Sequence, residues 1–111
     1  NPSLGAGTQP FGNVNGSTTR TLTLTNTGAT AAPFVISTIT VTKTNNGNGT
    51  YALAGGTCTI GSPVAAGGTC TVIVSFASPS GNSTTTGTLS VTGTGAGGIG
   101  SASASRNLTG Q

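Results

Sequence analysis

The chain has 111 residues, enough for one domain with one core, and we predict a single domain over residues 1–111. Only 3% of the residues are charged, against about 25% in an average protein. The chain has three basic residues, counting Lys and Arg together, and it has no Asp, Glu or His. This composition argues against ordinary acid–base catalysis and carboxylate metal sites. No run of about 20 apolar residues is present, so no membrane-spanning helix is predicted.

The first segment of the chain is polar. Residues 1–9 contain one large apolar residue, Leu4, and are predicted to form an edge strand or to lie along one. Phe11 and Val14 are the first expected contributors to the core. The Asn-Gly pair that follows them is a strong signal for a tight turn.

Two strands are predicted next. Residues 18–25 alternate, with leucines on one face and threonines on the other, as a half-buried strand does. Residues 34–42 change phase partway, because Phe34 and Ile36 share one face whereas the later apolar residues share the other. A β-bulge near Ser37 would bring both sets to the core.

The clearest strand pattern covers residues 65–76. Cys70, Val72, Val74 and Phe76 fall on one face, and polar residues fill most of the other. Further short strands are predicted at residues 51–53, 58–60, 86–92 and 101–110. The pattern predicts an all-β fold, an immunoglobulin-like Greek-key β-sandwich of about seven or eight strands.

The chain has two cysteines, Cys58 and Cys70. They are either two buried thiols or a disulfide, and we favour the disulfide. A bond closing so short a loop would stabilise the fold by roughly 3 kcal/mol. It would also imply an oxidising compartment, and we predict an extracellular or cell-surface location.

Several motifs in order resemble one family. They are Phe11-Gly12-Asn13-Val14, the run from Leu22 to Gly28, the run from Ala65 to Val72, Gly87-Thr88-Leu89-Ser90-Val91, and Leu108-Thr109-Gly110. This set resembles the choice-of-anchor D repeats of bacterial exported proteins, which are similar to Hydin-type immunoglobulin-like domains. The resemblance covers nearly the whole chain.

The resemblance implies a seven-stranded sandwich, often in tandem, on secreted or surface-anchored proteins. It also implies a pairing of Cys58 with Cys70, because the family commonly joins a cysteine before the Ala-Ala-Gly turn to one after it. It implies no common catalytic residues. The family usually follows this strand with Phe-x-Pro, and the chain departs from that pattern with one extra residue between Phe76 and Pro79.

The remaining chemistry is sparse. A serine nucleophile would have only Lys43 as its base, and we predict that the chain is not an enzyme and has no catalytic, cofactor-binding or metal site. Arg20, Lys43 and Arg106 lie far apart in the sequence, so no nucleic-acid partner is expected. Tyr51 is the best candidate for a glycan platform, although it is alone.

The sequence therefore predicts a non-catalytic structural module. Threonine-rich strands almost without charge have little protection at the sheet edges, so they favour contact with copies of themselves, in a filament, a pilus-like fibre or a tandem stalk. Residues 1–9 or 93–111 would supply an added strand. The alternative is an adhesin or glycan-binding domain that uses residues 44–50 and 78–86 against a glycan or host surface. A third hypothesis is a repeat from a larger exported enzyme.

Overall fold

The computed structural model describes residues 2–5, 7–13, 16–26, 33–45, 47, 49–65, 67–78, 84–95 and 100–111. The regular elements of this part are strands, in chain order β1 (Pro2–Ser3), β2 (Thr8–Pro10), β3 (Gly16–Asn26), β4 (Phe34–Lys43), β5 (Thr50–Gly55), β6 (Pro63–Val64), β7 (Thr69–Ser78), β8 (Thr85–Gly95) and β9 (Gly100–Gly110). None of the described residues belongs to a helix long and apolar enough to cross a membrane. The predicted all-β class is confirmed.

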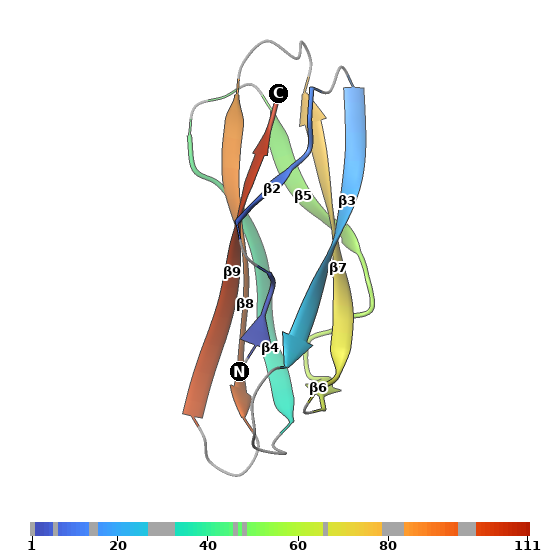
Figure 1. Cartoon of the computed structure of the whole chain (residues 1–111), viewed down its shortest axis with the longest axis vertical. Coiled ribbons are helices and arrows are strands. Elements are labelled where there is room, and N and C mark those ends of the chain that lie inside the picture. Colours follow the sequence, from blue (N-terminus) through green and yellow to red (C-terminus); the bar gives the residue numbers. More distant parts are fainter. Residues whose placement is uncertain are drawn as a thin grey trace.

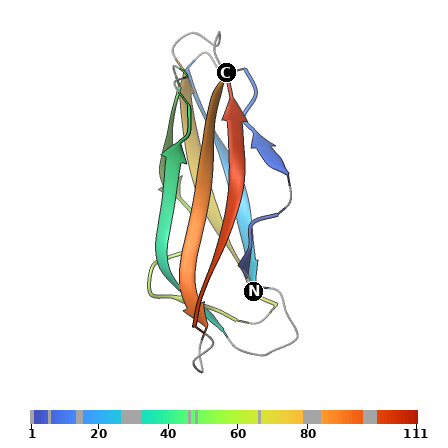
Figure 2. The same ribbon diagram turned by 90° about the vertical axis from the view of Figure 1, so that its left-hand side faces the viewer.

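The strands form two sheets that pack face to face as a β-sandwich (Figure 1). Sheet A has the order β1-β3-β7-β5, and sheet B has the order β2-β9-β8-β4-β6. The pairing of β2 with β9 is parallel, and the other pairings are antiparallel. Figure 2 shows sheet B face on, with β2 beside β9 at one edge.

The molecule is elongated, with extents of 48 × 21 × 19 Å. The start of β1 lies toward one end of the long axis, and Gln111 lies near the other (Figure 1).

The core lies between the sheets and follows the predicted alternation. In sheet A, Leu22 and Leu24 of β3 pair with Val72 and Cys70 of β7, and all four side chains are buried. Sheet B contributes Phe34, Ile36, Leu89, Val91, Ala104 and Leu108 from β4, β8 and β9. Since apolar side chains face inward at every second position on these strands, burial of this face stabilises the sandwich.

The predicted bulge in the strand after Pro33 is confirmed. The pairing of β4 with β8 shifts register between Ile36 and Thr38. Phe34 and Ile36 are fully buried before the shift, and Ile39 and Val41 pack against the core after it. The extra residue therefore turns both apolar pairs inward.

One predicted strand is wrong. Residues 58–60 form no strand, because the chain there crosses from sheet A to sheet B, and the short strand of this region is β6. The predicted last strand, residues 101–110, is confirmed as β9, which pairs with β8 along its whole length. Val14 lies outside the described residues.

The N-terminal segment crosses between the sheets. We call residues 2–5 and 7–12 the strap. Its first strand, β1, pairs with the end of β3, and its second, β2, pairs with the end of β9. The Phe11 N–H continues this pairing by donating to the Thr109 carbonyl at 2.8 Å. Leu4 and Phe11 are each 2% exposed, so the strap closes one side of the core.

Candidate interaction surfaces

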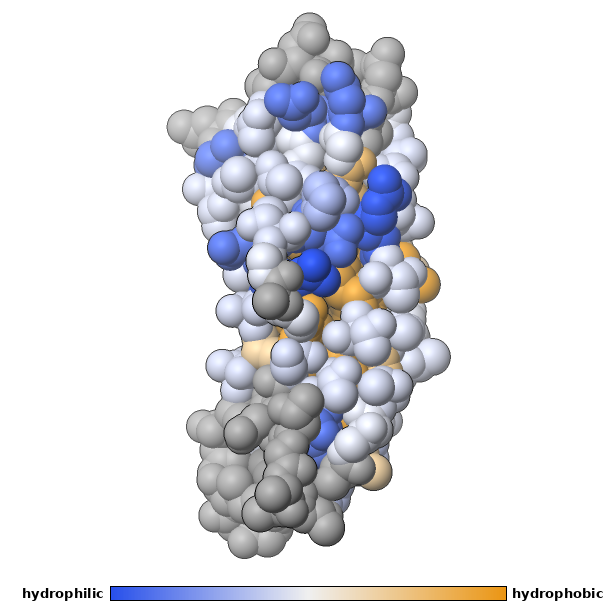
Figure 3. All heavy atoms as spheres, in the orientation of Figure 1, coloured by the Kyte–Doolittle hydropathy of each residue, from blue (hydrophilic) through white to orange (hydrophobic). Residues whose placement is uncertain are grey.

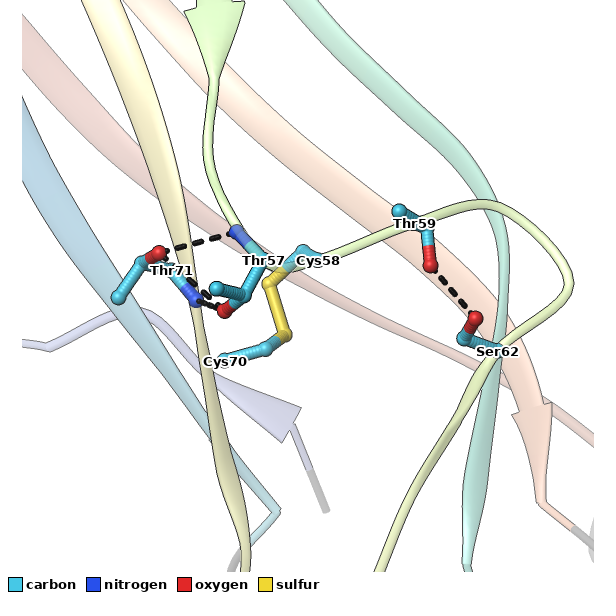
Figure 4. The surroundings of a disulfide bond; sticks show 6 residues. All are labelled: Thr57, Cys58, Thr59, Ser62, Cys70 and Thr71. Atoms are coloured by element: carbon cyan, nitrogen blue, oxygen red, sulfur yellow. Dashed lines mark hydrogen bonds between the residues drawn. A yellow bond between two sulfur atoms is a disulfide. The ribbon is translucent and has the colours of Figure 1, made fainter.

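The two cysteines form a disulfide that ties the β5–β6 connection to β7, with 5.0 Å between the Cα atoms of Cys58 and Cys70. Thr57 and Thr71 flank it (Figure 4). The Thr57 N–H donates to Thr71 Oγ1 at 3.1 Å, and the Thr71 N–H donates to Thr57 Oγ1 at 2.8 Å. The bond and these paired hydrogen bonds give this site an architectural role.

Two of the three basic residues occupy inward-facing positions. Arg20 of β3 stands opposite the fully buried Val74, and Arg106 of β9 stands opposite the fully buried Leu89. The inward placement of both arginines was not predicted, although the alternation of their strands indicates it. Arg20 has the same parity as the buried leucines of β3, and Arg106 has that of its buried neighbours on β9.

Both arginines reach the strap from opposite sheets. Arg20 Nη2 donates to the Phe11 carbonyl at 3.4 Å, and its guanidinium carbon lies 6.0 Å from the centre of the Phe11 ring. Arg106 Nη1 donates to the Leu4 carbonyl, also at 3.4 Å. Lys43 is exposed at the end of β4. Two of the chain's three cations therefore contact the strap.

An aromatic cluster fills the core beneath the strap. The Phe76 ring centre lies 5.7 Å from that of Phe11 and 4.8 Å from that of Tyr51. The Tyr51 hydroxyl donates to the Thr85 carbonyl at 2.6 Å. The predicted glycan platform is thus a ring packed between two others, which leaves it little free face for a sugar.

Burial raises the pKa of the Tyr51 phenol from 10.0 to about 12. Because the folded-state pKa of Tyr51 lies above its unfolded value, the contribution of the protonated phenol to the free energy of unfolding is fully present below about pH 10. That contribution is lost as the pH rises toward about 12. Because the chain has no Asp, Glu or His, we expect the free energy of unfolding to stay nearly constant from about pH 5 to pH 9 and to fall above about pH 10. Urea unfolding at a series of pH values measures this free energy.

The matched variant is Tyr51→Phe. It should lose the alkaline decline, and it should be less stable at neutral pH by about 1 kcal/mol because the Thr85 carbonyl loses its donor. Equal declines in both proteins above about pH 10 would refute the assignment to Tyr51.

The side of the sandwich away from the strap is less well closed. Tyr51 and Leu53 of β5 pair with Phe76 and Val74, which places them on the inner face of sheet A, yet Leu53 is 44% exposed. On β4, Ile39 and Val41 face inward but are only partly buried. We call Ile39, Val41 and Leu53, the incompletely covered residues of this side, the open seam; the Tyr51 ring packs instead against Phe11 of the strap.

The strand edges along the open seam have no described partner over much of their length. In the described chain, β5 pairs only with β7, and β6 covers only Phe34 and Val35 of β4. Beyond these, the Ser62 carbonyl and Gly61 N–H pair with Ile36. The rest of β4 up to Lys43 carries one charged residue, at its end. Natural sheets usually protect such edges with charges, proline or bulges, and here a register shift near Leu53 is the main such feature of β5.

The two loops of the adhesin alternative lie together where they are described. The Asn45 side chain donates to the Thr84 carbonyl at 3.0 Å and accepts from the Thr86 N–H at 3.1 Å. The Gly49 N–H donates to Thr85 Oγ1 at 2.8 Å. Residues 46, 48 and 79–83 of these loops lie outside the described residues.

No protein-family model and no curated protein sequence matches the chain. Among solved structures, the chain is similar to the secreted serine protease VesC from Vibrio cholerae, with a TM-score of 0.61 and 23% identity. The match covers 89% of this chain and 21% of the VesC chain, so the chain spans about a fifth of that protein.

This match contradicts the prediction that the chain is not an enzyme. The prediction depended on the missing Asp, Glu and His of this one domain, whereas the same fold recurs inside a protein named as a protease. The residues of one domain do not decide whether that domain belongs to an enzyme. At this level of identity the likeness concerns the fold alone.

Proposed function

We propose that the chain is an extracellular structural module that joins copies of itself, or neighbouring domains of a longer exported protein, through its sheet edges. The disulfide supports an oxidising compartment. The secreted neighbour supports export. The resemblance to choice-of-anchor D repeats, which occur in tandem, supports a position in a series of domains.

We also propose the finer topology, an immunoglobulin-like Greek key. The strand order supports it. Sheet A places β3, β7 and β5 side by side and sheet B places β9, β8 and β4 side by side, while the N-terminal strand is divided between the two sheets.

The observation that carries the proposed function is the open seam. Among the described residues, much of the β5 and β4 edges beside it has no backbone partner, its apolar side chains are partly exposed, and the one charged residue of these two strands is Lys43 at the end of β4. A strand from a neighbour would bond to the β5 edge and cover Leu53 in one step, which is the physical basis of strand addition. The nearly uncharged surface adds little repulsion between copies.

Substitution at the seam tests this proposal. Leu53→Lys places a charge where the added strand would bury an apolar group, and we expect self-association to weaken by at least about tenfold. Ile60→Lys is the matched control, because Ile60 is 66% exposed but lies in the β5–β6 connection and not on the edge strand. Sedimentation over a range of concentrations measures both.

A wild-type chain that stays monomeric throughout would refute the proposal, and so would equal weakening by both variants. Binding to glycans through residues 44–50 and 78–86, without self-association, would favour the adhesin alternative instead.

A second candidate function is supported by the VesC match. Since a domain of this fold makes up 21% of a secreted protease, this chain is a candidate accessory domain of an exported enzyme. Sequencing of the flanking gene tests it. A catalytic domain in the same reading frame would support this function, and further β-sandwich repeats would support the tandem stalk.

A further inference from the structure

We propose that the strap is exchangeable, so that the strap of one copy occupies the groove between β3 and β9 of a second copy and joins the copies in series. This inference rests on the proposed function, because it names the segment through which copies join. It uses the side of the sandwich opposite the open seam, so the two contacts can be tested separately.

The groove is shaped for the strap. Leu4 and Phe11 enter the core almost completely, and the Phe11 ring packs against Tyr51 at 5.4 Å between ring centres. Figure 3 looks onto this side and shows apolar side chains at the middle of the surface, with the most hydrophilic residues directly beside them. A sandwich whose own strap has left would expose this apolar groove, and a second copy carries the same matching segment.

The two arginines at the groove hinder an arbitrary occupant. With the strap displaced, Arg20 and Arg106 would border an apolar groove, and inward-pointing charges of this kind hinder pairing with unrelated strands. The strap meets both charges, because its Leu4 and Phe11 carbonyls accept from them. Since any strand offers such carbonyls, the preference for a strap of the same sequence comes from the Leu4 and Phe11 side chains, which fill the core.

The strap is also held by few backbone pairs. β1 pairs through Pro2 and Ser3, and β2 through its three residues, whereas β9 pairs with β8 along its full length. Of the two segments predicted to supply an added strand, the structure thus favours the N-terminal one. Gly12 and Gly16 have φ values of 79° and 134°, so glycine supplies the conformational freedom where the strap joins β3.

The strap makes the same contacts in its own groove and in the groove of another copy. The concentration of copies therefore decides which groove it occupies. A short flexible tether gives an effective concentration on the order of 1 mM, and exchange becomes substantial as the local concentration of copies approaches that value. Crowding on a surface or in a tandem array favours it, and dilution favours the self-filled monomer.

Cross-linking of variants that each carry one added cysteine tests the exchange. Thr8 and Asn107 are register partners, and both side chains line a shallow hollow of about 620 Å³ on the outer face of sheet B. Thr8→Cys and Asn107→Cys chains of different mass are mixed, concentrated and mildly oxidised, and peptide mapping separates the new bond from Cys58–Cys70. The control mixture pairs Thr8→Cys with Thr23→Cys, because Thr23 is exposed on sheet A.

We expect a Thr8→Cys/Asn107→Cys heterodimer severalfold above the control mixture, rising with concentration. The double variant in one chain should lock the strap into its own groove and abolish exchange. A heterodimer no more abundant than in the control overturns the exchange, and if Leu53→Lys still weakens association the proposed function stands. If the heterodimer forms and Leu53→Lys leaves self-association unchanged, the exchange is supported and association through the open seam is refuted.

Discussion

Replacement of Phe76 with alanine is expected to lower the free energy of unfolding by about 3–5 kcal/mol. Phe76 is fully buried and packs against the Phe11 and Tyr51 rings. Gly49 and Gly110 border the ring, and a Cβ on either would overlap it. Because two backbone segments are fixed around this ring, the cavity would collapse poorly. Since a domain is typically stable by only about 5–15 kcal/mol, denaturant unfolding should show a large shift.

Two controls separate this effect from a general effect of substitution in β7. Phe76→Leu keeps much of the apolar volume and should cost about half as much or less. Ile73→Ala alters the outer face of the same strand and should cost about 1 kcal/mol. Equal losses for Phe76→Ala and Ile73→Ala would contradict the assignment of the two faces.

Loss of the disulfide is the second large effect. The cysteines are separated by 12 residues, and on loop-closure arguments the bond stabilises the fold by about 3 kcal/mol. The Cys58→Ala/Cys70→Ala double variant should therefore unfold at a clearly lower denaturant concentration. It leaves the strap contacts intact, so the variant should keep the same fold.

Reduction of the wild-type protein provides the comparison. Reduced wild type and the double alanine variant should agree to within about 1 kcal/mol, because both lack the same constraint on the unfolded chain. A reduced protein with an unchanged unfolding midpoint would show that the bond contributes nothing to stability.

The predicted strands came from local alternation, which is why their faces agree with the structure. Residues 18–25 alternate strictly, as do residues 69–76 of the predicted stretch 65–76. Their inward residues pair across β3 and β7. The phase change near Ser37 was equally visible, because a bulge leaves a local trace in the sequence. Each of these features depends on neighbouring residues alone.

The error at residues 58–60 has a physical cause, which is that non-local pairing decided the outcome. The segment around Cys58 has apolar residues at strand spacing, but the bond to Cys70 holds it in a crossing between the sheets. The last strand was predicted within one residue of its bounds, but the pairing with β8 that holds so weakly apolar a strand was not predicted. Neither contact can be derived from the local pattern.

The candidate surfaces were predictable only in part. Low edge charge was visible in the composition, but which strands lie at the edges follows from the strand order. The inward placement of Arg20 and Arg106 could have been found by counting alternate positions from the buried leucines of the same strands. Their contact with the strap could not, because it joins residues 9 and 102 positions apart.

Electron microscopy of the purified, oxidised chain at high concentration tests most directly whether this sandwich is a self-joining structural module. We expect elongated assemblies whose repeating unit has the dimensions of the sandwich, 48 Å along its axis, and we expect them to dissolve into single particles on dilution. Dispersed single particles at every concentration, with no ordered contact between copies, would contradict the proposed function.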